Sequence, residues 1–187
     1  MRIGTINGSL SSESINATLV RALTMLIGER ADVISVPIGC LPLYNRDLDA
    51  DYPASAAAFK MRLRTLDALI IATPEYDRTM PAALKNAFEW GSRPYGENAF
   101  AGIPAGVVGA STGAIGTAAA QQHVRNVLAF LDAPTLGQPE VYLRFDPHSF
   151  APDGTITNDS TRHFLTSWVD RFLAHIERHS ATERPES

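Results

Sequence analysis

Ala68-Leu69-Ile70-Ile71-Ala72-Thr73-Pro74-Glu75-Tyr76 is the stretch that most clearly indicates the fold. Its first five residues are all apolar, which is typical of a strand buried on both faces of a parallel sheet. The apolar run ends abruptly at a polar segment that contains a proline. In α/β proteins, a buried strand that leads into such a loop ends at the edge of the sheet where ligands bind.

Similar apolar runs alternate with helical patterns on either side of this stretch. We expect strands at residues 3–6, 31–37, 68–72, 105–110 and 138–143, and helices at about 14–29, 53–66, 81–90, 115–131 and 160–177. Because strand–helix–strand units cross over with one hand, this order predicts a parallel sheet covered by helices on both faces. The sequence therefore predicts one α/β domain over residues 1–178 and a frayed tail over residues 179–187.

Composition excludes several classes of protein. The 187 residues carry a formal net charge of −4 at pH 7, which argues against a nucleic-acid partner. The single cysteine, Cys40, allows neither an intramolecular disulfide nor a cysteine-based metal cage. His175 and His179 have a spacing that metals accept, but no third ligand is near them, so we expect no metal site. Without a signal-like segment or a membrane span, we expect a cytoplasmic protein.

The loop after the first strand is rich in hydroxyl groups: Gly8-Ser9-Leu10-Ser11-Ser12-Glu13-Ser14-Ile15-Asn16. It leads into a helix whose N-terminus offers free N–H groups and partial positive charge, and these attract phosphate. Ser9, Ser14 and Asn16 could add neutral donors, although simple helix capping explains one or two such residues equally well. The patterns GxxxxGK[ST] and GxGxxG are both missing, which disfavours a triphosphate site and an ordinary dinucleotide fold.

Two further loops have unusual chemistry, at residues 73–80 and 111–116. Tyr76 offers an aromatic surface between two stiffening prolines, which suits a flat ring such as isoalloxazine. Glu75 could equally be a nucleophile or a base, so its role stays open. Loops after the first, third and fourth strands of such a sheet are expected to share one site.

These motifs together resemble the NADPH-dependent FMN reductase family, and most closely its chromate- and quinone-reductase branch. The match runs in consistent order over about residues 3–178 and includes Gly8-Ser9-Leu10, Pro42-Leu43-Tyr44-Asn45, Thr73-Pro74-Glu75-Tyr76, Ser92-Arg93-Pro94 and Gly109-Ala110-Ser111-Thr112-Gly113. The resemblance implies a flavodoxin-like three-layer sandwich with a five-stranded parallel sheet in the order 2-1-3-4-5. It also implies non-covalently bound FMN, NADH or NADPH as co-substrate, quinones or similar small-molecule electron acceptors (azo compounds and chromate-type oxidants included), and a homodimer or homotetramer.

The resemblance also assigns site residues. The positions that match the phosphate-binding loop are Ser9, Ser11, Ser14, Ile15 and Asn16; those that match the flavin-lining loops are Pro74, Glu75, Tyr76, Asp77, Ser111 and Gly113. Arg78 is expected to border the entrance, and Arg93 to contact an anionic substrate or a neighbouring subunit. Hydride transfer depends on orientation, so we assign no catalytic acid or base.

Of the positions that depart from the family pattern, Ser11 and Asp77 matter most; Ala82 and Thr112 replace the usual glycine and proline with milder consequences. Ser11 stands where the family usually has arginine, and this predicts weaker phosphate binding. Asp77 stands where the family usually has asparagine; an ionised carboxylate there would lower the flavin potential, whereas a protonated one could donate a hydrogen bond as asparagine does. Three other functions stay open: a flavin-binding electron carrier, a sensor without turnover, and a nucleoside-processing transferase with Glu75 as nucleophile.

Overall fold

The computed structural model describes residues 1–151 and 153–180, in which strands and helices alternate as expected. The strands are β1 (Arg2–Asn7), β2 (Asp32–Ser35), β3 (Ala68–Ala72), β4 (Ala105–Ser111) and β5 (Val141–Arg144). The helices are α1 (Ile15–Ile27), α2 (Ala54–Arg64), α3 (Ala82–Ser92), α4 (Ala118–Phe130) and α5 (Asp159–Ser180). Within the described residues, no helix is both long enough and apolar enough to cross a membrane.

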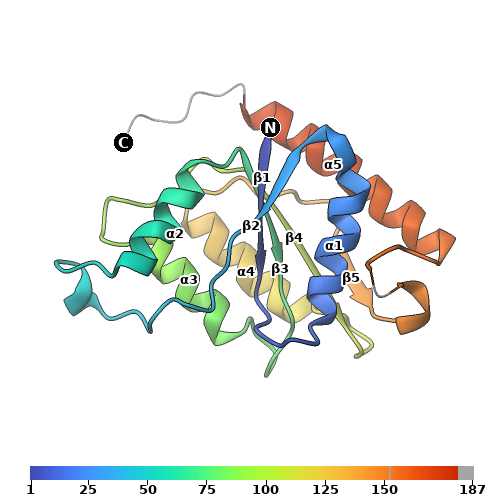
Figure 1. Ribbon diagram of the computed structural model, residues 1–187, viewed down its shortest axis with the longest axis horizontal. Helices are drawn as coiled ribbons and strands as arrows, with labels where there is room; N and C mark the ends of the chain where they lie inside the picture. Colours follow the sequence, from blue (N-terminus) through green and yellow to red (C-terminus); the bar gives the residue numbers. More distant parts are fainter. Residues whose placement is uncertain (152, 181–187) are drawn as a thin grey trace.

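All five strands form one parallel sheet in the order β2-β1-β3-β4-β5, which confirms the predicted topology (Figure 1). β3 is the central strand and is buried along its whole length, because helices cover both faces of the sheet. The order reverses between β1 and β3, since the chain moves from β1 outward to β2 and then back to β3. In such sheets this switch point is where a ligand binds.

Alternate side chains of the sheet belong to two hydrophobic cores. Ile70 packs in the core formed with α1 and α5, where Trp168 and Phe172 are among the largest buried side chains. Ile71 points to the opposite face and packs in the core formed with α2, α3 and α4, which includes Trp90. In Figure 1, α1 and α5 lie on one side of the sheet and α2, α3 and α4 on the other.

Two helix ends differ from the prediction because of glycines. α4 begins at Ala118 instead of 115, since Gly116 has a left-handed backbone (φ 61°) that packs against the main chain of Tyr142. α3 continues through Gly91 to Ser92, where the sequence predicted a stop before the glycine. A Cβ at Gly91 would lie 2.3 Å from Cε2 of Phe100, so this glycine allows close packing inside a helix.

The bounds of two strands and of the last helix also differ from the predicted bounds, by one to three residues. β5 begins at Val141 instead of 138, and Pro139 has no N–H to donate to a ladder. β2 covers only Asp32–Ser35 of the expected 31–37. α5 continues through Ser180, whereas the sequence predicted a helix over about 160–177, so the helix includes the first two residues of the predicted tail. The remainder of the predicted tail, residues 181–187, lies outside the described residues.

Candidate functional site

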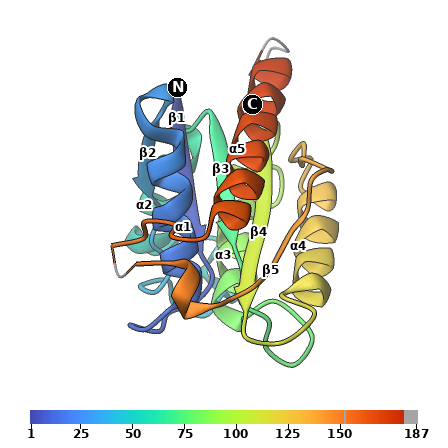
Figure 2. The ribbon, with the colours of Figure 1, turned by 90° about the vertical axis from the view of Figure 1, so that its right-hand side faces the viewer.

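The loops that follow β1, β3 and β4 lie together at the carboxyl edge of the sheet (Figure 2). Main-chain hydrogen bonds connect neighbouring strand ends: the N–H of Gly8 donates to the carbonyl of Ala72 (2.8 Å), and that of Thr73 donates to the carbonyl of Val108 (3.0 Å). The three loops predicted to share a site are therefore adjacent. The arrangement places that site at the switch point between β1 and β3.

The first loop supports an open helix N-terminus. Ser14 is the N-cap of α1, and its hydroxyl oxygen accepts from the N–H of Ala17 (3.1 Å). Asn7 braces the loop from the end of β1, because its Nδ2 donates to Oγ of Ser14 and its Oδ1 accepts from the N–H of Ser9. The N–H of Ile15 at the start of α1 has no carbonyl one turn earlier in the helix, and the first turn of α1 contains no acidic residue. This end of α1 can therefore accept an anion.

Two predicted phosphate ligands have other partners. The side chain of Asn16 is 1% exposed and spans to β4, where its Nδ2 donates to the carbonyl of Ala110 (3.0 Å) and its Oδ1 accepts from the N–H of Ala110 (2.9 Å). The side chain thus joins α1 to the sheet through both of its polar atoms, and the main-chain N–H of Asn16 stays in the first turn of α1. Ser11 is exposed, and its hydroxyl accepts from the N–H of Glu13 (3.2 Å).

The loop after β3 forms a tight turn that presents Tyr76. Tyr76 and Thr79 exchange two main-chain hydrogen bonds of 3.1 and 2.9 Å, and Asp77 and Arg78 between them have φ values of 50° and 64°. Two left-handed central residues define a type I′ turn, in which aspartate and asparagine are both accommodated. Arg78 is less suited to this conformation, which costs on the order of 1 kcal/mol for such a residue. The Tyr76 ring is 50% exposed at the tip of the turn.

Glu75 lies beneath this turn with a side chain that is only 6% exposed. Its Oε1 accepts from Nη1 of Arg78 (2.9 Å), and its Oε2 accepts from the N–H of Ala120 (3.2 Å). Ala120 lies in the first turn of α4, whose N-cap residue Thr117 makes no side-chain capping bond. Glu75 therefore caps α4 from 45 residues away. This pairing leaves the carboxylate poorly placed as a nucleophile, which weakens the transferase hypothesis.

The loop after β4 closes the other side of the site. Ser111 ends β4, its hydroxyl accepts from the N–H of Gly113 (3.1 Å), and residues 112–115 are exposed. Pro74, by contrast, is buried at the base of its loop. The structure therefore brings Pro74, Tyr76, Ser111 and Gly113 to the same edge of the sheet, with Pro74 as part of the supporting structure.

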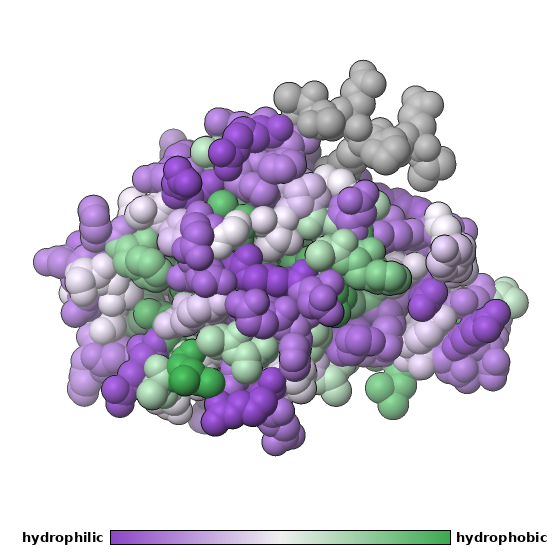
Figure 3. All heavy atoms as spheres, turned by 180° about the vertical axis from the view of Figure 1, so that it is seen from behind, coloured by the Kyte–Doolittle hydropathy of each residue, from purple (hydrophilic) through white to green (hydrophobic). Residues whose placement is uncertain are grey.

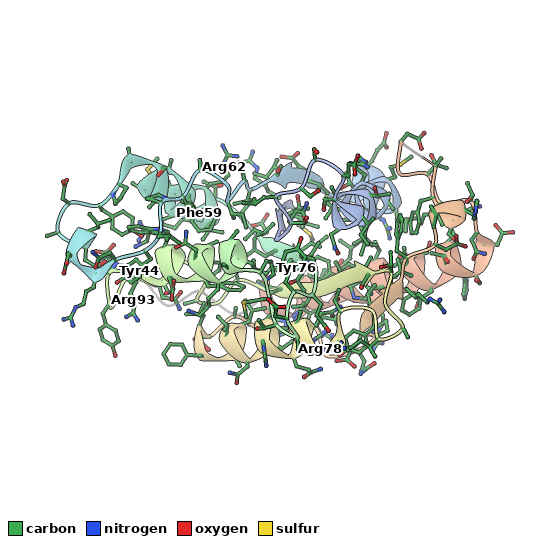
Figure 4. All side chains as sticks on the ribbon, turned by 90° about the horizontal axis from the view of Figure 1, so that it is seen from below. Tyr44, Phe59, Arg62, Tyr76, Arg78 and Arg93 are labelled. Carbon is green, nitrogen blue, oxygen red and sulfur yellow. The ribbon has the colours of Figure 1, made fainter. Side chains whose placement is uncertain are left out.

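Arg78 and Arg93 lie far apart. Figure 4, which looks onto the carboxyl edge, places Tyr76 and Arg78 near the centre and Arg93 toward the end where Tyr44 also lies. Arg93 follows the last residue of α3, whereas the first residue of that helix follows the Tyr76 turn. Within one chain, the structure thus brings Arg78 to the candidate site and leaves Arg93 outside it.

The end of α3 around Arg93 is held by a polar cluster. The carbonyl of Arg93 accepts from the hydroxyl of Tyr52 (3.0 Å) and from Nζ of Lys60 (2.6 Å), which also pairs with Glu97 (3.2 Å). Burial lowers the pKa of Lys60, although its contact with Glu97 opposes this effect. Burial also raises the pKa of Tyr52. These groups fix the main chain at Arg93.

A groove of about 520 Å³ separates α3 from α4. Apolar atoms of Phe88, Val127 and Phe130 contribute to its lining, and Phe130 is 84% exposed. Arg93 also lines this groove, and its Nε is buried without a hydrogen-bond partner among the described residues. Figure 3 views the molecule from the side on which α4 lies and shows hydrophobic patches between hydrophilic ones.

Sequence reasoning did not place His123 among the site residues, although its side chain contacts the Tyr76 turn. Its Nδ1 lies 2.6 Å from the hydroxyl oxygen of Thr79, so α4 contacts the Tyr76 turn a second time. Nothing near His123 in the sequence indicates this partner 44 residues away. Asn7 was missed as well, although a polar residue at the end of an apolar strand is a usable signal.

The sheet order, the switch point and the converging loops define a flavodoxin-like α/β protein. A solved flavodoxin of Pseudomonas aeruginosa shares this fold, with a TM-score of 0.55 at 18% identity over 95% of this chain and 99% of its own. Within this class the chain belongs to the NADPH-dependent FMN reductase family, whose sequence profile matches residues 1–148. The predicted resemblance is thereby confirmed, and with it an oxidoreductase that uses FMN and NAD(P)H.

Individual relatives match nearly the whole chain. A 2-hydroxy-1,4-benzoquinone reductase of a Burkholderia species is 42% identical over 94% of this chain and 96% of its own. A quinone reductase of Pseudomonas putida is also 42% identical, over 96% of both chains. The solved NAD(P)H:acceptor oxidoreductase FerB of Paracoccus denitrificans has a TM-score of 0.92 at 39% identity, over 95% of this chain and 98% of its own.

Proposed function

We propose that this chain is an FMN-containing reductase that takes two electrons from NADH or NADPH and passes them to quinones or similar small acceptors. The observation that carries the proposal is the convergence of three features at one switch point: the N-terminus of α1, whose first turn contains no acidic residue, the Tyr76 turn and the Ser111 loop. The similarity to quinone reductases supplies the acceptor class. We also propose that residues 1–178 act as one domain in the cytoplasm, where a single exposed cysteine stays reduced.

Helices α1, α3 and α4 begin at this edge of the sheet, and α1 is the one that follows the hydroxyl-rich loop. The first turn of α4 already receives the Glu75 carboxylate, whereas the first turn of α1 has no acidic residue. The FMN phosphate would therefore bind at α1, against the main-chain N–H groups of Ile15 and Asn16 and the hydroxyls of Ser9, Ser11 and Ser14. The residues present fit such a group.

The flavin ring would lie between the other two loops. The exposed Tyr76 ring supplies an apolar surface next to Asp77, and Ser111 and Gly113 border the opposite side. When bound, FMN supplies the hydride and electron chemistry of the reaction. The chain itself binds and orients the reactants, and Arg78 provides a cation at the rim that favours anionic partners.

We propose that the protein is a homodimer or larger homo-oligomer that associates through the groove between α3 and α4. An exposed Phe130 beside a groove on the same face suits an isologous contact, in which one copy's ring enters the other's groove. Arg93 lines this groove, and its Nε is buried and has no hydrogen-bond partner among the described residues. Its position therefore favours contact with a neighbouring subunit over contact with substrate.

Purified protein tests the proposed function directly. FMN should produce a protein-bound flavin spectrum, and NADPH should then be consumed when a benzoquinone is added. A carrier or sensor would bind FMN without useful NADPH oxidation, and a transferase would bind no flavin and would release free base from nucleosides. Protein that neither binds FMN nor consumes NADH or NADPH would overturn the proposal.

A further inference from the structure

The turn that presents Tyr76 needs support from outside itself. Its two central residues, Asp77 and Arg78, are both left-handed and neither is glycine. Only the two hydrogen bonds between Tyr76 and Thr79 close the turn internally. A turn with these residues would populate other conformations in a free peptide, so the surrounding structure determines its shape.

The support comes from one face of α4. Oε2 of Glu75, on the first side of the turn, accepts from the N–H of Ala120, and the hydroxyl of Thr79, on the other side, contacts Nδ1 of His123. Ala120 and His123 are three residues apart, so they lie on the same face of the helix. Both sides of the turn are therefore held to a single rigid element. Figure 4 shows Tyr76 and Arg78 above the region where α4 begins.

The charges at Glu75 match this role. Its buried carboxylate faces two positive groups, the guanidinium of Arg78 and the N-terminal end of α4. Arg78 is 75% exposed, which makes the ion pair the weaker of the two contacts because water screens it. The bond to Ala120 is partly buried and is therefore less screened by water. A glutamine can keep the bond to Ala120, whereas a leucine of similar size loses both contacts.

We propose that Glu75 and His123 are positioning residues that fix the Tyr76 turn against α4 and so preform the surface on which the flavin ring lies. This inference rests on the proposed function. It makes Glu75 neither a nucleophile nor a proton donor, because its two oxygens are committed to the turn and the helix. Because a preformed surface binds a ligand without an ordering cost, loss of the brace should appear first as weaker FMN binding.

The test compares FMN affinity and turn mobility in matched variants. We expect Glu75→Leu to raise the FMN dissociation constant about tenfold and His123→Leu to raise it by a smaller factor, while Glu75→Gln stays within about threefold of wild type. Fluorescence quenching of FMN measures the affinity. Amide hydrogen exchange at residues 76–79 in FMN-free protein should become faster in the leucine variants. Excess FMN should restore turnover to Glu75→Leu.

Asn158→Leu is the matched control, because Asn158 caps α5 through the N–H of Thr161 (2.9 Å) and is remote from the turn. It should lower thermal stability without changing FMN affinity. Equal FMN affinity in wild type and Glu75→Leu would overturn this inference but leave the proposed function unaffected. Loss of turnover in FMN-saturated Glu75→Gln would also overturn it, because the carboxylate would then take part in the chemistry. Wild-type protein that binds no FMN would overturn the proposed function and this inference together.

Discussion

The backbone conformation at position 77 explains why aspartate is tolerated there, and the charge of Asp77 bears on the potential of a bound flavin. It occupies the first central position of a type I′ turn with φ of 50°, where asparagine, aspartate and glycine are preferred. Exchange between asparagine and aspartate therefore leaves the turn intact and alters only the charge next to the proposed flavin position.

We therefore expect Asp77→Asn to raise the midpoint potential of bound flavin. Removing a nearby exposed carboxylate changes the energy of an anionic reduced flavin by about 1 kcal/mol, or roughly 20 mV for a two-electron couple. Equilibration with a redox dye of known potential measures the shift. An unchanged potential would mean that the carboxylate points away from the flavin.

His175 makes the stability of the folded protein depend on pH. It is buried in α5, its Nε2 lies 3.0 Å from the carbonyl of Pro134, and burial lowers its pKa below 6.5, with His179 and Arg178 contributing in the same direction. The unfolded chain then binds a proton more readily than the folded chain does. Stability from this residue is present above about pH 6.5 and is lost as the pH falls through the lowered pKa.

Replacing His175 by glutamine tests this dependence. Glutamine can still donate to Pro134 but does not titrate, so the thermal midpoint of His175→Gln should fall less than that of wild type between about pH 7.5 and pH 5.5. Calorimetry at several pH values measures the difference. The exposed His163 gives the control His163→Gln, which should follow wild type. Identical pH profiles for wild type and His175→Gln would contradict the assignment.

Asn16 and Glu75 have hydrogen-bond partners that sequence reasoning did not foresee, and the two cases share a cause. Asn16 and Glu75 have types that suit a binding site, and their neighbours along the chain favour that reading. Their actual partners, Ala110 and Ala120, lie 94 and 45 residues away. Local chemistry predicts that a polar side chain needs a hydrogen-bond partner, but only the tertiary structure decides which one.

At the scale of elements, the Asn16 side chain is the link between α1 and β4. We expect Asn16→Leu to destabilise the protein by about 3 kcal/mol, because a side chain of similar volume would leave the buried N–H and carbonyl of Ala110 unpaired. For a chain of this size, that corresponds to a fall of roughly 10 °C in the thermal midpoint. Circular dichroism on heating measures it.

The exposed Ser11 gives the control Ser11→Ala, whose midpoint should stay close to wild type. A midpoint for Asn16→Leu equal to that of Ser11→Ala would show that the contact with Ala110 contributes little. FMN affinity measured on the same samples would separate loss of the fold from loss of the site.

The order and type of the elements were predictable because each strand is a short apolar run and each helix has a periodic face. The residues at which the helices and strands begin and end were less predictable. Gly91 resembled a helix stop, but it lies within α3 because Phe100 packs where a side chain would be. Gly116 lies inside a helical pattern but has a left-handed backbone that delays the start of α4. A glycine alone does not reveal which of these two requirements it meets.

At the scale of the whole molecule, the surface between α3 and α4 is the place to test association. We expect Phe130→Glu to weaken self-association at least about tenfold, since it places a charge in an apolar contact. Size-exclusion chromatography with light scattering over a range of concentrations measures this. Met25→Glu is the control, because Met25 is exposed on α1 on the opposite face of the sheet. A wild-type protein that is monomeric throughout would contradict the proposed interface.

The brace between the Tyr76 turn and α4 also bears on the order of events during synthesis. The ribosome releases the first loop early, but the turn after β3 acquires its support only when residues 120 and 123 have emerged and α4 has folded. A nascent chain that ends before them would carry the Tyr76 turn without its brace and should hold the cofactor more weakly than the finished chain. Cofactor capture would therefore tighten late in synthesis.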